Sequence, residues 1–120
     1  MVLVDTSVWI DHLRRNSPGL AGLLDNGEIA VHPFVIGELA CGNLANRKRI
    51  LSLLHALPAV QRVEDDEILL FIERHSLAGK GLGLLDVHLL ASCRLNGHPL
   101  WTRDRHLKAA AEELGLGFDQ

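Results

Sequence analysis

The chain has 120 residues with a formal net charge of −3, and hydrophobic side chains make up 48% of it. This length fits one domain, expected to span residues 1–120, which can bury enough surface to fold without disulfides or a structural metal. The acidic balance excludes a general basic surface for nucleic acid, and an aromatic content of 4% argues against RNA modules that stack bases on aromatic platforms.

Short apolar runs alternate with helical patterns along the chain. In chain order, strands are predicted at 2–5, 29–31, 59–63, 99–102 and 116–118. The predicted helices cover 7–15, 18–25, 33–42, 47–57, 65–78, 86–96 and 104–114. This alternation indicates an α/β fold whose central, mainly parallel sheet is covered by helices on both faces. Because such sheets bind ligands beyond the carboxyl ends of their strands, residues that follow strands are the first candidates for a site.

The two cysteines and the apolar stretches indicate the cellular compartment of the protein. Cys41 and Cys93 lie far apart in helical, apolar surroundings and form no CxxC pair, so both are predicted to be reduced core residues of a cytoplasmic protein. No apolar stretch approaches the ~20 residues that span a bilayer. The start MVLVD also lacks the basic region of a secretory signal, and no contact with a membrane is expected.

Three aspartates stand at predicted strand ends or helix starts. Asp5 follows the apolar residues VLV, Asp86 follows GLGLL and opens a helix, and Asp104 follows PLWTR. Aspartate is also a favoured helix N-cap, because its carboxylate accepts hydrogen bonds from the free N–H groups of the first turn. A cap and a site ligand are compatible, so the sequence leaves both roles open for each aspartate.

Glu38 is less easily explained as a surface residue. It lies in PFVIGELACG, where residues 34–42 hold no other charged side chain, and on a helical wheel it falls between Phe34 and Val35. The helix offers no polar stripe, so Glu38 should face the interior or a cleft. A lone buried carboxylate is costly, and a bound cation would remove that cost.

Four converging carboxylates would need a counter-charge at neutral pH. Their all-oxygen ligand set suits Mg²⁺, with Mn²⁺ as a substitute, rather than zinc. Such an ion lowers the pKa of a bound water and neutralises charge on a phosphoryl group, so metal-dependent phosphodiester hydrolysis is predicted. Hydroxyl side chains flank the acids and are candidates to support them: Thr6, Ser7 and Thr102.

Four segments in order carry a resemblance to a known family: VLVDTSVWIDHLRR, GELACG, GLGLLDVHLLAS and LWTRDRHLKAAAEELGL. Together they make the chain similar to PIN-domain proteins, and more closely to the VapC-type toxins of type II toxin–antitoxin systems. The resemblance implies a three-layer α/β/α sandwich and a Mg²⁺- or Mn²⁺-dependent endoribonuclease. It also implies a cognate antitoxin that blocks the cleft, and a homodimer.

The resemblance assigns catalysis and metal binding to the matching acids, which are Asp5, Glu38, Asp86 and Asp104. Many family members carry a further acid shortly after the last aspartate, where this chain has Arg105, His106 and Leu107. The number of metal ions is therefore left open. Arg103 and Arg105 flank Asp104, and either could contact an RNA phosphate or simply be solvated.

Two other functions compete with the nuclease. A catalytically inactive PIN-like binding scaffold would have no reason to keep four mutually repelling acids. A phospho-receiver signalling domain would need a phosphate-accepting aspartate after a mid-chain strand, and residues 48–63 contain no aspartate.

Overall fold

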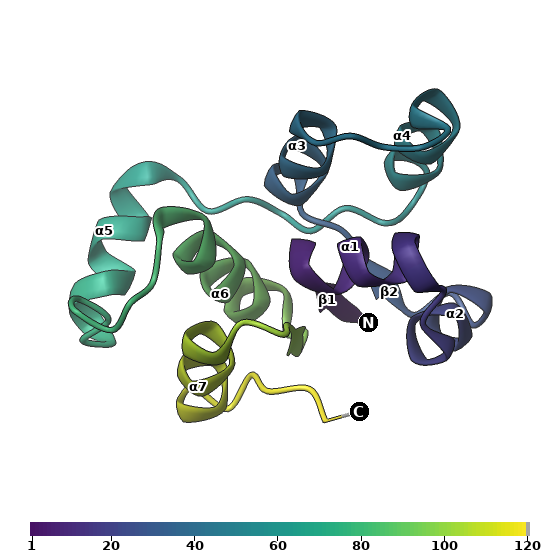
Figure 1. Cartoon of the computed structure of the whole chain (residues 1–120). Coiled ribbons are helices and arrows are strands. Elements are labelled where there is room, and N and C mark those ends of the chain that lie inside the picture. The colour runs from purple at the N-terminus through teal and green to yellow at the C-terminus, as the bar shows by residue number, and fades with distance from the viewer. Residues whose placement is uncertain (120) are drawn as a thin grey trace.

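The structure is a computed structural model that describes residues 1–119. Its centre is a parallel sheet in the order β2-β1-β3, so the first strand lies in the middle (Figure 1). The strands are short: β1 (Val2–Val4), β2 (Ile29–Ala30) and β3 (Leu100–Trp101). Register pairs Leu3 with Ala30 on one side and with Leu100 on the other. The predicted parallel sheet is confirmed.

Two of the five predicted strands are reduced to single bridges. The predicted strand 59–63 contributes only the parallel bridge between Val31 and Ala59, and 116–118 contributes only the bridge between Leu100 and Gly117. The backbone hydrogen bonds at the first bridge run from Val31 N to Pro58 O and from Val60 N to Val31 O, after which the chain leaves the sheet. The prediction of strands over these two ranges was therefore wrong, although both segments do lie at the edges of the sheet.

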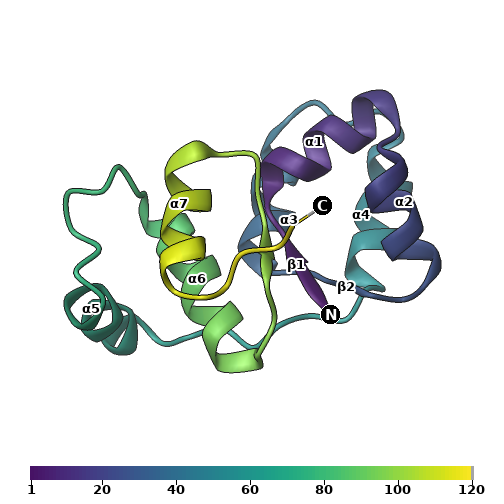
Figure 2. The same ribbon diagram turned by 90° about the horizontal axis from the view of Figure 1, so that it is seen from below.

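Helices connect and cover the strands. They are α1 (Thr6–Arg15), α2 (Pro18–Asp25), α3 (Pro33–Cys41), α4 (Arg47–His55), α5 (Asp65–Arg74), α6 (Leu84–Asn96) and α7 (Arg105–Glu113). Seen from below, α6 and α7 lie on one side of β1, whereas α1, α2 and α4 lie on the other (Figure 2). This arrangement is the predicted sheet with helices on both faces.

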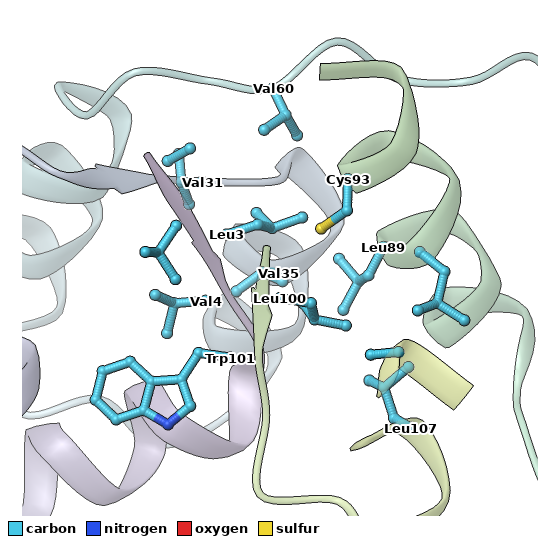
Figure 3. Packing of buried hydrophobic residues seen from close by; sticks show 14 of the residues in the cluster. Leu3, Val4, Val31, Val35, Val60, Leu89, Cys93, Leu100, Trp101 and Leu107 are labelled. Carbon is cyan, nitrogen blue, oxygen red and sulfur yellow. The ribbon is translucent and has the colours of Figure 1, made fainter. Parts of the chain in front are cut away.

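The core forms where the sheet meets these helices. Leu3 and Val4 of the central strand are fully buried, and they pack with Val35 of α3, Leu89 of α6 and Leu107 of α7 (Figure 3). Strands buried on both faces read as continuous apolar runs, which explains the sequence VLV. The core thereby fixes β1 and β3, and with them the residues that follow each strand.

The two cysteines differ in their surroundings. Cys93 of α6 is buried, and burial raises the pKa of its thiol to about 12. Cys41, the last residue of α3, is exposed, so the prediction that it belongs to the core was wrong. Its helix is apolar in composition, but its final turn projects beyond the core. Within residues 1–119, no helix combines the length and apolar character needed to span a bilayer.

Candidate functional site

Asp5 is the most firmly held acid of the site. Its backbone N–H donates to Trp101 O at 2.9 Å, so the sheet fixes its main chain, and its side chain caps α1 through Thr6 N at 2.8 Å. Carboxylate Oδ2 accepts hydrogen bonds from Ser7 Oγ at 2.9 Å and from Thr102 Oγ1 at 2.7 Å. The side chain is buried at 6% exposure yet fully hydrogen-bonded. Asp5 is therefore a helix cap, and this role is compatible with the predicted site role.

Thr102 joins Asp5 to Asp104. It follows β3, is buried, and accepts a hydrogen bond from Asp104 N at 3.0 Å through the same hydroxyl that donates to Asp5. Asp104 then caps α7, because its Oδ1 accepts from His106 N at 2.9 Å and from Leu107 N at 3.0 Å. Its second oxygen, Oδ2, makes no hydrogen bond within residues 1–119, so it can take another ligand.

Glu38 reaches the site from the side of a cleft. It is exposed on α3 and accepts a hydrogen bond from Thr6 Oγ1, which places it beside the residue that follows Asp5. Glu38 also lines a cleft of about 410 Å³ between α1, α3 and the loop 42–46. Of the two positions predicted for this glutamate, the structure places it at a cleft and not in the interior.

The pKa of Asp86 is affected by the charges of the other acids. It lies in the first turn of α6 and accepts a hydrogen bond from Gly83 N at 2.9 Å. Desolvation raises the pKa of Asp86 above its usual 3.8, the Gly83 hydrogen bond lowers it, and the charges of the three remaining acids raise it further: Asp5, Asp104 and Glu38. The other three predicted acids therefore all lie within electrostatic reach of Asp86, although the four come from separate segments.

The carboxylates are nevertheless not gathered into a closed metal shell. Among residues 1–119, no group of three or more His, Cys, Asp or Glu side chains is placed to hold a metal ion directly. The donor set still fits Mg²⁺ or Mn²⁺, because these hard ions keep several waters and bind through one or two carboxylate oxygens. Such a hydrated ion would neutralise the negative charges that act on Asp86. It could also bind Oδ2 of Asp104.

Basic side chains lie at the rim of the acids. Arg103 donates its backbone N–H to Ser7 Oγ at 3.1 Å, while its guanidinium pairs with Asp11 at 3.2 Å. Asp11 also pairs with Arg15, at 3.4 Å. Arg105 is exposed at the first residue of α7. Both predicted RNA contacts are therefore accessible, and Arg103 is held against α1.

Sequence reasoning missed a pair of buried histidines behind the site. His32 caps α3, the helix of Glu38, and His88 lies on α6 two residues after Asp86; their exposures are 0% and 2%. Their rings are 6.3 Å apart between centroids. The position of His32 between the buried run IAV and Pro33 was a usable signal, because Pro at the first helical residue marks the preceding residue as the cap.

Comparisons with known proteins agree with this architecture. A model described as the PIN domain matches residues 2–113. Ribonuclease VapC32 of Mycobacterium tuberculosis is 48% identical over 119 residues, which cover 98% of this chain and 96% of that protein.

Solved structures show the same fold at lower sequence identity. PAE2754 from Pyrobaculum aerophilum has a TM-score of 0.67 at 19% identity and matches 94% of this chain and 90% of that one. FitAB bound to the IR36 DNA fragment has a TM-score of 0.60 at 16% identity, over 93% of this chain and 91% of that one. FitAcB from Neisseria gonorrhoeae has a TM-score of 0.57 at 20% identity, over 93% of this chain and 94% of that one.

Proposed function

The chain belongs to the PIN-domain family, and from that premise we propose that it is a metal-dependent endoribonuclease toxin of a toxin–antitoxin pair. The observation that carries the proposal is the convergence of four acids from separate segments: Thr102 joins Asp5 to Asp104, and Thr6 joins Asp5 to Glu38. Asp86 lies near enough to them that their charges add to desolvation in raising its pKa. A fold that holds four carboxylates in mutual repulsion is best explained by a cation that offsets it. The relative named ribonuclease supports RNA as the substrate.

We assign the ion to oxygens of four residues, namely Asp5, Glu38, Asp86 and Asp104. When bound, Mg²⁺ or Mn²⁺ supplies a water of lowered pKa and neutralises charge on the phosphoryl oxygens. The protein orients this set: Ser7 and Thr102 fix the carboxylate of Asp5, and Thr6 fixes that of Glu38. Hydrogen bonds that fix a carboxylate keep it from turning away when the ion is absent.

RNA would approach over the rim formed by α1 and the segment after β3. Arg103 and Arg105 flank Asp104 there, and their guanidinium groups can pair with phosphates on either side of the cleaved bond. Such contacts would position RNA without reading its sequence. The formal net charge of the chain is −3, so attraction of RNA must come from local groups of basic side chains such as this rim.

The antitoxin remains part of the proposal as a protein partner. The cleft beside Glu38 is lined partly by apolar side chains of α1 and α4, including Ile10, Leu13 and Ile50, and Ile10 and Leu13 are exposed. An apolar segment of a small partner bound there would cover the cleft next to the acids. The homodimer implied by the family resemblance is tested separately, by light scattering of the purified protein.

Metal removal and replacement test the enzymatic proposal. RNA cleavage by the purified protein should stop in EDTA and return with Mg²⁺ or Mn²⁺, whereas the Asp5→Asn variant should stay inactive with either ion. Cleavage that persists in EDTA, or that only Zn²⁺ restores, would refute the metal assignment. Failure of the intact protein to cut any RNA, with either ion present and the fold intact by circular dichroism, would favour a binding scaffold.

A further inference from the structure

Two buried imidazole nitrogens behind the acidic site have no hydrogen-bond partner within residues 1–119. They are Nε2 of His32 and Nδ1 of His88. Buried polar atoms in folded proteins are almost always paired with protein or ordered water, so both nitrogens call for an explanation. The two residues are neighbours, and that makes a shared explanation more economical than two separate ones.

The local hydrogen bonds fix which nitrogen can donate. Nδ1 of His32 accepts a hydrogen bond from Phe34 N at 3.0 Å, so it carries no proton. Desolvation, followed by the charges of His88 and Arg62, lowers the pKa of His32 to about 4, and the ring is neutral at pH 7. A neutral ring with an unprotonated Nδ1 has its proton on Nε2. The orphaned atom of His32 is thus a donor, and Nδ1 of His88 can be the matching acceptor.

The spacing of the rings excludes a direct hydrogen bond between the two nitrogens, and a water is the smallest group that could pair with both. Their centroids are 6.3 Å apart with an interplanar angle of 68°. Ring nitrogens lie roughly 1 Å from the ring centre, so the two atoms are at least about 4 Å apart, beyond the ~3.2 Å of a direct N–H donor. Phe34 closes one side, with its ring 5.0 Å from His32 and 4.8 Å from His88, and Arg62 lies 4.6 Å over Phe34.

The pair connects the two helices that carry Glu38 and Asp86. His32 caps α3, so its position fixes where the helix of Glu38 begins. His88 follows Asp86 by two residues on α6, which is a rotation of about 200° around the helix, so His88 faces the core while Asp86 faces the site. A hydrogen-bonded link between His32 and His88 would therefore fix α3 relative to α6, and with these helices the separation of Glu38 and Asp86.

We propose that one buried water accepts a hydrogen bond from His32 Nε2 and donates one to His88 Nδ1. Through this link the two histidines act as positioning residues that hold Glu38 and Asp86 in register for the divalent ion. The link itself rests only on the geometry of α3 and α6. Its effect on ion binding rests on the proposed metal-dependent function.

Imidazole NMR of the intact protein tests the link without any variant. Long-range ¹H–¹⁵N spectra at neutral pH should show His32 protonated at Nε2 and His88 unprotonated at Nδ1. A His88 ring protonated at Nδ1 would leave two donors facing one another and would overturn the link. This measurement does not depend on metal or RNA, so it stands even if the proposed function fails.

Variants with matched chemistry test the positioning role. His32→Asn keeps an acceptor for the cap through the amide oxygen but removes Nε2, and His88→Phe keeps a ring but removes Nδ1. Each should weaken Mn²⁺ binding by about tenfold in calorimetry without RNA, and the double variant should lose no more than either single variant. His88→Asn, whose amide oxygen can replace Nδ1 as acceptor, should recover much of the affinity.

His12→Asn is the control. Nδ1 of His12 also accepts a hydrogen bond from a backbone N–H, that of Ser17, but His12 lies on α1 and is not part of the His32–His88 pair. This variant should leave Mn²⁺ affinity unchanged. Additive losses in the double variant, or unchanged affinity in both single variants, would overturn the positioning role. An intact protein that binds no Mn²⁺ would overturn it together with the proposed function, while the NMR result would still decide the link.

Discussion

Asp5 and Glu38 both accept a hydrogen bond from Thr6, yet the two acids are held in very different ways. Asp5 is buried behind the central strand, and its carboxylate accepts hydrogen bonds from Thr6, Ser7 and Thr102. Glu38 is exposed on the wall of a cleft and accepts one hydrogen bond, from Thr6. Both carboxylates belong to the proposed ion site, but only that of Asp5 is fixed by the core.

The difference shows two ways in which a fold can supply a metal ligand. The oxygen atoms of Asp5 are placed in advance by the sheet, so losing this residue should damage both structure and activity. The carboxylate of Glu38 is exposed and has only the hydrogen bond from Thr6 within residues 1–119, so losing it should affect activity alone. Side chains locked by packing and several hydrogen bonds are generally more precisely placed than exposed ones.

The largest effect is expected from Asp5→Asn. Loss of a ligand to the ion should lower the rate of RNA cleavage by at least about 100-fold. Replacing the carboxylate also weakens its charge-assisted hydrogen bonds with Ser7 and Thr102, so the free energy of unfolding should fall by about 1–2 kcal/mol. Urea denaturation and single-turnover cleavage measure the two effects. Full stability with lost activity would show that Asp5 is no more anchored than Glu38.

Glu38→Gln is the matched change at the other acid. Cleavage should fall by about 10- to 100-fold, because the ion loses a charged ligand. The free energy of unfolding should stay within about 0.5 kcal/mol of the parent, because the side chain is exposed and the amide can still accept from Thr6. A clear loss of stability in urea denaturation would contradict the contrast between the two acids.

Thr102→Val tests whether the anchoring of Asp5 matters. The change keeps the shape but removes a hydroxyl that donates to Asp5 and accepts from Asp104 N. Asp5 loses a buried hydrogen bond and Asp104 N a partly buried one, so stability should fall by about 1–3 kcal/mol. Cleavage should fall by about tenfold, less than for Asp5→Asn, because every proposed ligand remains. Thr102→Ser, which keeps the hydroxyl, should recover both quantities.

The pH dependence of stability should reveal how far desolvation and the neighbouring acids disfavour the charge of Asp86. Desolvation and the neighbouring acids raise the pKa of Asp86 above 3.8, so the folded state binds its proton more tightly than the unfolded state. Its contribution to stability is therefore complete below about pH 3.8 and is lost as pH rises through the raised pKa. In EDTA, Asp86→Asn should be more stable than the parent at pH 7, and this gap should shrink when the pH is lowered.

Saturating Mg²⁺ should reverse that ranking at pH 7, because the ion stabilises the parent but not the variant. Thermal unfolding with and without Mg²⁺ measures both differences. A parent that is already the more stable of the two in EDTA would show that desolvation and repulsion do not disfavour the charge of Asp86 as inferred.

The smallest effect concerns the basic rim. Arg103→Gln should weaken RNA binding by a few-fold and reduce the slope of log affinity against log salt by about 1, the value for one phosphate contact. Asp11→Asn frees the guanidinium of Arg103 from its ion pair and should leave that slope intact. Filter binding of a catalytically inactive Asp5→Asn background measures both. An unchanged slope in Arg103→Gln would show that Arg103 is a solvated surface residue that does not contact an RNA phosphate.

The sequence was most informative where one segment carried the whole signal. An apolar run followed by an aspartate was enough to place Asp5 at the end of β1. The absence of any other charge on the helix of Glu38 predicted a position in the interior or at a cleft, and the structure shows the cleft. The sequence was least informative for partners far apart along the chain. The Thr102–Asp5 hydrogen bond joins residues 97 positions apart, and no local pattern specifies it.

The same limit explains the misplaced elements. Residues 59–63 have the composition of a strand, but only Ala59 finds a partner, because the chain leaves the sheet edge after Val60. Burial of Cys41 was inferred from apolar neighbours, yet its position at the end of α3 exposes it. Composition gives the type of an element, whereas its extent and surroundings depend on contacts that form only in the folded chain.

The contrast between the two thiols makes Cys41 a natural attachment point for a reporter group. Cys93 is buried with a pKa of about 12, so maleimide reagents at neutral pH should modify Cys41 alone. Cys41 lies three residues after Glu38, about one helical turn away. A fluorophore placed there could follow ions, RNA or a protein inhibitor entering the cleft without any engineered cysteine.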